Sequence, residues 1–134
     1  IDSEAYNKKL ETVLQACKEL TKQLECDVEP WRQDHAYFDL INKYCNSVTL
    51  MNYSTKPSES IRQATIVMRK IKLPYLTGFE TGLINKPQIS FDGTSWNKLE
   101  YAIRITENYI RWRVWNRKFL GSAIHCWGFC NLLK

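Results

Sequence analysis

One short run near the C-terminal end of the chain combines aromatic rings with cations. Residues 109–118 read Tyr-Ile-Arg-Trp-Arg-Val-Trp-Asn-Arg-Lys. In an extended strand alternate side chains point to opposite faces, so the arginines would share a face with Tyr109 and Trp115. Arginine binds phosphate through a planar fork of donors, and aromatic rings stack on unpaired bases. This run predicts a non-enzymatic nucleic-acid-binding surface, for RNA or single strands rather than duplex DNA. The predicted contact residues are Arg104, Tyr109, Arg111, Arg113, Trp115, Arg117 and Lys118, with Lys98 as a further candidate.

The charge of the chain is distributed unevenly and supports the same prediction. The 134 residues include 19 Lys and Arg against 14 Asp and Glu, a net charge of +5. Residues 1–59 carry a net charge of −3, and residues 60–134 carry +8. Basic side chains near phosphates release condensed counterions, which favours a polyanionic partner. A net charge of this size also serves solubility alone, and a basic strand could instead meet an acidic protein partner.

Two other classes of function remain open. The first is a protein-interaction or assembly module, since Trp, Tyr and Arg are enriched at protein interfaces. The second is a small basic nuclease, in which His35 and His125 would exchange protons or Asp92 and Glu100 would hold a metal ion. Their spacing supports neither arrangement, and the sequence does not decide which histidine would act. The sequence therefore favours binding over catalysis and assigns no catalytic residue, metal or cofactor.

The elements that would position these residues are predicted from hydrophobic periodicity. Apolar residues at three- and four-residue steps predict a helix over 6–24, capped by Asp2 or Ser3, and a second helix that begins at Pro30. A loop is expected over 52–60 and a short helix over 60–73. Alternation around an Asp92-Gly93 turn predicts an antiparallel meander over 87–116. The expected fold is one α+β domain over 1–134, a helical pair (about 1–50) packed on a basic, aromatic, β-rich part (about 60–134).

Residues 94–116 also fit a helix. Leu99, Ile103, Thr106 and Ile110 recur at helical steps, and Glu100 precedes Arg104 by four residues in the order that stabilises helices. β-branched and aromatic residues are frequent here and favour strands. If the segment is helical instead, the protein is all-α and the predicted surface is rearranged.

The remaining signals concern the environment of the chain. Five cysteines, an odd number, favour thiols in a reducing, intracellular compartment. No apolar run reaches the length of a membrane span. The apolar run 119–133 is expected to close the core, or else to form a surface for homo-oligomerisation. Asn52-Tyr53-Ser54 is a formal glycosylation sequon of a kind that often occurs by chance.

Overall fold

Helices and strands alternate along the chain and build one parallel sheet. The computed structural model describes residues 2–114, 117–126 and 132. Its four strands lie in the order β1-β2-β3-β4, and every neighbouring pair is parallel. The elements are α1 (Ser3–Leu20), β1 (Glu25–Val28), α2 (His35–Tyr44), β2 (Ser47–Leu50), α3 (Pro57–Met68), β3 (Tyr75–Glu80), α4 (Trp96–Tyr109), a π-helical turn η1 (Ile110–Val114) and β4 (Phe119–His125).

The predicted antiparallel meander is wrong, and so is the all-α alternative. The segment that was expected to hold strands forms α4 and η1, while the sheet contains the short runs β1 and β2 that periodicity did not single out. The side chain of Ser95 caps α4 by accepting a hydrogen bond from Lys98 N at 3.3 Å. Leu99, Ala102 and Thr106 are buried along one side of α4. This helical stripe packs in the core, and its burial outweighs the local preference for strands.

The Asp92-Gly93 turn forms, but it does not join two strands. Gly93 has a φ of 70°, in the left-handed region that glycine adopts at little cost. The chain then enters α4 instead of a second strand. The Asp92-Gly93 pair therefore predicted the turn correctly, but the strand predicted after it is the helix α4.

The N-terminal helices agree better with the sequence. The side chain of Asp2 caps α1 by accepting from Glu4 N at 3.0 Å, as predicted. The second helix begins at His35 rather than at Pro30, although Tyr37 and Phe38 are buried on it as expected. The short helix predicted over 60–73 is present as α3 and begins three residues earlier, with Pro57 in its first turn. None of the helices in the described residues is long and apolar enough to cross a membrane.

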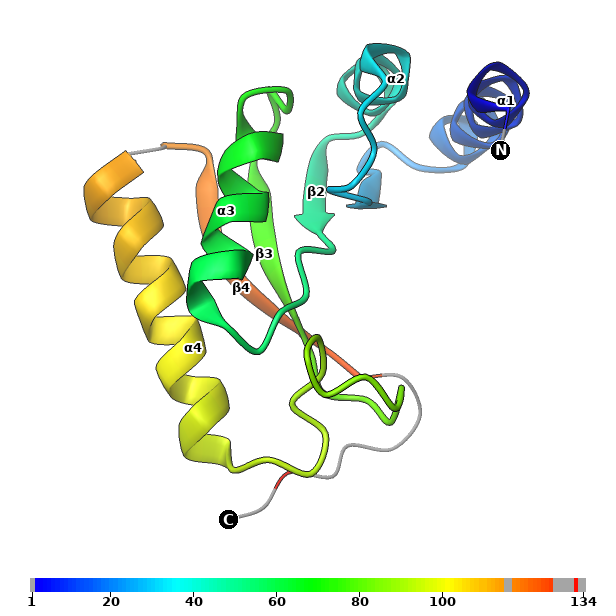
Figure 1. Cartoon of the computed structure of the whole chain (residues 1–134). Helices are drawn as coiled ribbons and strands as arrows, with labels where there is room; N and C mark the ends of the chain where they lie inside the picture. The colour runs from blue at the N-terminus through cyan, green and yellow to red at the C-terminus, as the bar shows by residue number, and fades with distance from the viewer. Residues whose placement is uncertain (1, 115–116, 127–131, 133–134) are drawn as a thin grey trace.

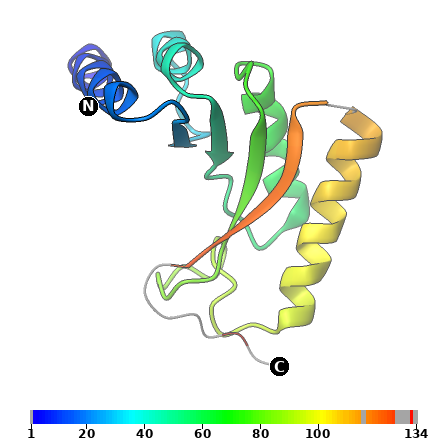
Figure 2. The same cartoon turned by 180° about the vertical axis from the view of Figure 1, so that it is seen from behind.

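The helices that follow the strands cover one face of the sheet. Figure 1 shows α3 in front of β3 and β4 with α4 beside it, and Figure 2 shows the same strands with no helix in front of them from behind. The core on the helical side joins residues of α2 and α3 to alternate residues of the strands, among them Val28, Leu50 and Tyr75. No helix in the described part of the chain lies on the opposite face (Figure 2). We call this the open face; by strand alternation it carries Glu25, Asp27, Thr49, Leu76, Gly78, Glu80, Ala123 and His125.

A disulfide ties the first strand to the helix that follows it. Cys26 in β1 and Cys45 at the end of α2 are bonded, with their Cα atoms 6.2 Å apart. Cys126 is disulfide-bonded as well, and Cys17 is a free thiol. Disulfides persist mainly in oxidising environments, so the Cys26–Cys45 bond weighs against the reducing compartment expected from the cysteine count. The location of the protein stays a prediction.

Two buried tyrosines make a matched pair for a stability test. The hydroxyl of Tyr75 is buried and has no hydrogen-bond partner among the described residues, whereas the hydroxyl of Tyr37 accepts from Glu29 N at 3.1 Å. An unsatisfied buried polar group costs about 1 kcal/mol or more, and a satisfied one contributes about as much. Tyr75→Phe is therefore expected to raise the free energy of unfolding by about 1 kcal/mol and Tyr37→Phe to lower it by about 1 kcal/mol. Urea denaturation measures both, and a loss of stability in Tyr75→Phe would contradict the assignment.

Candidate functional site

The carboxyl ends of the two longest strands bring an acid and a histidine together. Glu80 ends β3 and His125 ends β4, and the two residues are direct partners in the register of the sheet. In open parallel sheets ligands bind outside the carboxyl ends of the strands. Both side chains lie on the open face, which no described helix covers.

Glu80 is a buried carboxylate with a defined set of partners. The residue is 1 % exposed. One carboxylate oxygen accepts from Gly82 N at 2.5 Å, and the other lies 2.8 Å from His125 Nδ1. A ring nitrogen at this distance from a carboxylate donates its hydrogen, so Nδ1 is assigned as protonated. A buried charge is tolerated only when it is paired. The contact therefore fixes both the orientation of the imidazole and its tautomer.

The side chain of His125 is partly exposed and stacks on a tyrosine. Its side chain is 36 % exposed, against 1 % for that of Glu80. The rings of Tyr53 and His125 are stacked, with centroids 5.8 Å apart and planes 7° apart. Tyr53 follows β2, whereas His125 ends β4, so the tyrosine reaches across β3 to make this contact. The imidazole is thus held by a carboxylate at one edge and by a ring on one side.

A glycine in β3 makes room for Tyr53. A Cβ atom added to Gly78 would lie 2.6 Å from the carbonyl oxygen of Leu50 and 2.7 Å from Cε1 of Tyr53. Real Cβ atoms do not approach backbone oxygens this closely, and the Leu50 carbonyl is held in the neighbouring strand. Any larger residue at position 78 would separate β2 from β3 or displace the tyrosine. Gly78 therefore lets the ring of Tyr53 pack directly against the backbone of β3.

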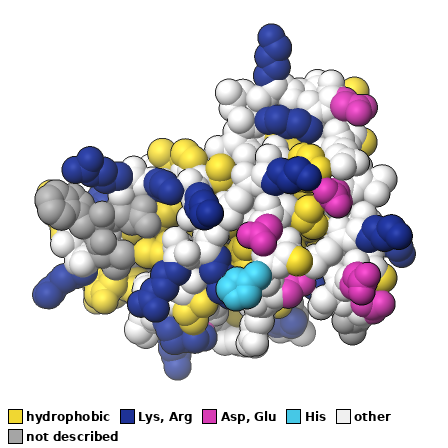
Figure 3. Space-filling model, turned by 90° about the horizontal axis from the view of Figure 1, so that it is seen from above, with side chains coloured by type: hydrophobic (Ala, Val, Ile, Leu, Met, Phe, Trp, Pro, Cys, Tyr) yellow, Lys and Arg dark blue, Asp and Glu magenta, His cyan; other side chains and the backbone are white. Residues whose placement is uncertain are grey.

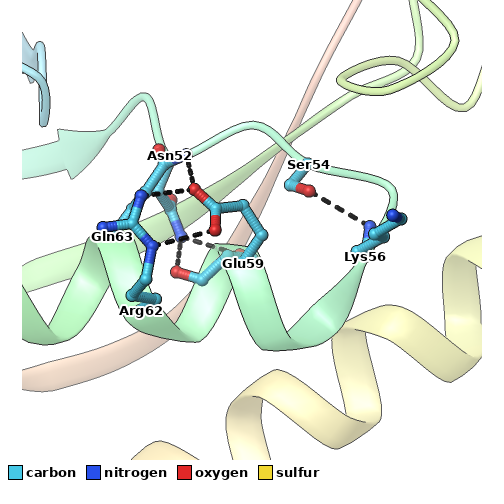
Figure 4. A network of polar contacts seen from close by, with 7 residues as sticks. Asn52, Ser54, Lys56, Glu59, Arg62 and Gln63 are labelled. Carbon is cyan, nitrogen blue, oxygen red and sulfur yellow. Dashed lines mark hydrogen bonds and ion pairs between the residues drawn. The ribbon is translucent and has the colours of Figure 1, made fainter.

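The loop before α3 is anchored so that Tyr53 faces the open side. Asn52 is fully buried; its Nδ2 donates to the carbonyl and hydroxyl oxygens of Ser60, and its Oδ1 accepts from Gly78 N at 2.9 Å. Lys56 N donates to Ser54 Oγ at 3.1 Å in the same loop (Figure 4). These bonds tie the loop to both α3 and β3. The backbone at Tyr53 is consequently fixed on both sides.

Figure 4 also shows a charged cluster on the first turns of α3. Arg62 binds both carboxylate oxygens of Glu59, at 2.6 and 2.9 Å, and Gln63 adds a bond at 2.9 Å. The hydrogen bonds from Arg62 and Gln63 lower the pKa of Glu59 to about 2. Since the carboxylate is largely exposed, this cluster orders the helix surface and contributes little to stability.

The sequon formed by residues 52–54 does not act as a glycosylation site in the folded chain. Asn52 is 0 % exposed, and the amide nitrogen that would carry a glycan donates two hydrogen bonds inside the protein. Glycosylation requires an accessible surface asparagine. The folded structure therefore gives this motif a structural role.

Two acids of the open face act on the hydroxyl of Tyr53. The pKa of Tyr53 is raised to about 12, chiefly by partial burial, with smaller contributions from the negative charges of Asp27 and then Glu80. Asp27 belongs to β1 and Glu80 to β3, on either side of β2. The tyrosine hydroxyl therefore lies within the field of both carboxylates, and the face is acidic.

An alkaline titration tests this arrangement. Because the folded state disfavours the phenolate, Tyr53 keeps its proton above the value near 10 of an unfolded chain. Its contribution to stability is complete below about pH 10 and is lost as the pH rises towards about 12. Absorbance at about 295 nm should show the late titration in the wild type and lose one late group in Tyr53→Phe. Asp27→Asn should shift the Tyr53 titration downward; an unchanged curve would show that the charge of Asp27 does not reach the hydroxyl.

The residues predicted to bind nucleic acid do not share one face. Arg104 and Tyr109 lie in α4, Arg111 and Arg113 lie in η1, and Arg117 and Lys118 precede β4. Trp115 is outside the described residues. The strand that would have aligned these residues is helical, so side chains two positions apart point in different directions. Two cations contact other rings instead: Arg104 lies 5.8 Å from the Tyr101 ring, and Arg111 lies 5.4 Å from the Phe119 ring.

The charge asymmetry survives in the folded molecule. Figure 3 shows the end at which the strands begin. Over α3 and α4 only Lys and Arg side chains appear among the charged groups, whereas acids and bases mix over α1 and α2. The second half of the chain therefore presents a basic side, away from the carboxyl edge that carries Glu80 and His125.

The sequence-based nuclease arrangements are not assembled. His35 opens α2, the helix after β1, and His125 ends β4, with β2 and β3 between them. Asp92 lies in the loop before α4 and Glu100 in the helix itself. No three His, Cys, Asp or Glu side chains in the described ranges lie close enough together to hold a metal ion. Sequence reasoning missed Glu80, Tyr53 and Asp27; the available signal was an acid directly after the buried run Tyr75–Phe79.

No family model, curated protein or solved structure matches this chain significantly.

Proposed function

We propose that the protein is a hydrolase in which Glu80 and His125 transfer protons at the carboxyl edge of the sheet. The observation that carries this proposal is the 2.8 Å contact between the buried carboxylate of Glu80 and Nδ1 of the partly exposed His125. In many acid–base sites a carboxylate orients the imidazole that transfers the proton. This arrangement replaces the two-histidine pair considered from the sequence.

The pair would work as an orienting acid and a proton carrier. His125 takes a proton from a water molecule through Nε2, and the resulting hydroxide attacks the electrophilic carbon of the substrate. Glu80 accepts the Nδ1 hydrogen bond throughout and stabilises the imidazolium that forms. The imidazolium then gives its proton to the departing alkoxide, so the site returns to its initial state. Stacking on Tyr53 keeps the ring in position during both transfers.

The charge of the open face selects the class of substrate. Its strand residues include Glu25, Asp27 and Glu80, and none of them is a lysine or an arginine. Carboxylates repel phosphate groups, and the pKa of Tyr53 shows that two of them act at the site. An uncharged ester or glycoside fits this surface, and a phosphodiester does not.

A chromogenic panel tests the proposal. The wild type is incubated with nitrophenyl acetate, nitrophenyl butyrate, nitrophenyl glycosides and bis-nitrophenyl phosphate. We expect turnover of at least one uncharged substrate and none of the phosphodiester, with the activity lost in His125→Gln and retained in His35→Gln. The proposal fails if every substrate is hydrolysed at the rate of the buffer alone, or if His125→Gln matches the wild type.

The predicted nucleic-acid binding stays a second candidate, on a different part of the surface. Lys98, Tyr101 and Arg104 lie along the outer side of α4, and Tyr101 is 53 % exposed. They line two adjoining cavities of about 510 and 390 Å³ that share Asn97. An exposed ring between two cations can stack a base and neutralise phosphates.

A titration separates this candidate from the first. Fluorescence anisotropy of a labelled mixed-sequence RNA should show binding at low salt that weakens steeply as the salt rises. Arg104→Ala with Lys98→Ala should weaken that binding while leaving hydrolysis unchanged. If the wild type does not bind at low salt, this candidate is lost and the hydrolase proposal is unaffected.

A further inference from the structure

No helix of the described residues covers the open face, and no further strand pairs with either edge of the sheet there. Parallel sheets are almost always covered on both faces. Here the described helices cover one face only, while the other carries the buried carboxylate of Glu80 and the nearly buried Thr49. β1 and β4 each pair on one side only among the described residues. A parallel sheet with one face not covered by helices and two unpaired edges can still bind a second sheet.

We propose that two copies of the chain close into one eight-stranded parallel barrel, with β4 of each copy beside β1 of the other. The open faces of both copies would then line the interior. This inference rests on strand order and edges, and it does not depend on the proposed catalytic function.

The order of the strands fits such a closure. Strands that follow one another in sequence are also neighbours in space, and each crossover carries its helix on the same side. When the strand–helix unit is repeated in this way, a parallel sheet can close into a barrel with its helices on the outside. Eight strands form a barrel whose interior is filled by side chains, and two copies of four supply that number. A two-fold axis generates both junctions from one type of contact.

The two edges have opposite charge where they would meet. β1 exposes Glu25 and Asp27, whereas Arg117 and Lys118 are exposed immediately before β4. Parallel pairing places the beginnings of two strands side by side, so Arg117 of one copy lies near Glu25 of the other. Complementary charges favour this junction.

Apolar side chains at both edges add area to the junction. Leu120 on β4 is 57 % exposed, and Leu20 at the end of α1 is 88 % exposed. A long edge strand with exposed apolar residues readily accepts another strand. In the barrel these side chains would meet the other copy.

The mass of the protein in solution tests the proposal. Light scattering after size exclusion is expected to give twice the mass of one chain at low salt. Glu25→Lys and Arg117→Glu each place like charges at both junctions, so each variant alone is expected to dissociate at least about tenfold more readily. Arg69→Glu, at the exposed end of α3, removes the same kind of charge away from both edges and should leave the mass unchanged.

Mixing the two edge variants makes the test independent of any loss of folding. In a heterodimer of Glu25→Lys with Arg117→Glu, one junction is native and the other is charge-reversed, so both are attractive. At a concentration at which each variant alone is dissociated, an equimolar mixture should therefore recover the dimer. The proposal is overturned if the wild type has the mass of one chain at the highest concentration, or if the mixture stays dissociated. It is also overturned if Arg69→Glu dissociates as readily as the edge variants.

Discussion

Replacing Glu80 with glutamine is expected to lower the rate of hydrolysis by roughly 100- to 10,000-fold. Glutamine has the same shape and can still accept the hydrogen bond from Gly82 N. Without the negative charge, the imidazolium that forms on His125 loses its stabilising partner, and the amide can also present its NH₂ group to Nδ1 and favour the wrong tautomer. Steady-state rates on whichever uncharged nitrophenyl substrate the wild type turns over measure the effect.

Two controls separate this loss from a loss of folding. Thermal melts of Glu80→Gln should show a cooperative transition, and Glu100→Gln, on the exposed side of α4, should keep the wild-type rate. A folded Glu80→Gln variant with wild-type activity would contradict the role assigned to the carboxylate.

Removing the Cys26–Cys45 disulfide is the second change with a large expected effect. The bond closes a loop with a sequence separation of 19 residues. Opening a loop of this length raises the entropy of the unfolded chain and costs about 3 kcal/mol. The double replacement Cys26→Ser with Cys45→Ser should lower the free energy of unfolding by this amount in guanidinium denaturation.

Cys17, a free thiol among the described residues, supplies the matched control. Cys17 is partly buried in α1 and forms no disulfide, so Cys17→Ser should change stability by well under 1 kcal/mol. Reducing agent should destabilise the wild type more than the double variant, in which the disulfide of Cys126 is the remaining target. Equal stability of the wild type with and without reductant would contradict a stabilising bond and would restore the reducing compartment as the simpler expectation.

The sequence predicted the local features of the N-terminal half because those features depend on neighbouring residues. The cap at Asp2 is set by residues a few positions apart, and the helix formed. Pro57 was placed in the loop expected over 52–60 and instead lies in the first turn of α3. The start of α2 was missed because Pro30 and Trp31 fit a helical turn but lie in the connection that follows β1.

The sheet could not be predicted in the same way. β1 and β2 contain four residues each, too few for a periodic signal, and their pairing joins segments about 20 residues apart. In α4 the helical stripe was visible, but the many β-branched and aromatic residues of the segment favoured strands, and only the tertiary contacts of Leu99 and Ala102 decide between the two.

The candidate site was missed for the same physical reason. Glu80 and His125 are 45 residues apart, and only parallel pairing of β3 with β4 makes them partners. Tyr53 reaches them because position 78 is a glycine, a requirement that no local pattern expresses. The basic, aromatic run 109–118 was predicted as a binding surface because its residues are adjacent in sequence. In the fold its described residues lie at the end of α4, in η1 and before β4.

In the proposed mechanism Glu80 and His125 act as one proton-transferring unit, and a double-mutant cycle of the two residues measures their coupling. Hydrolysis rates are measured for the wild type, Glu80→Gln, His125→Gln and the variant with both changes. If the carboxylate works only through the imidazole, the double variant should be no slower than His125→Gln alone. If the two losses multiply instead, the residues act independently and the account of the site is contradicted.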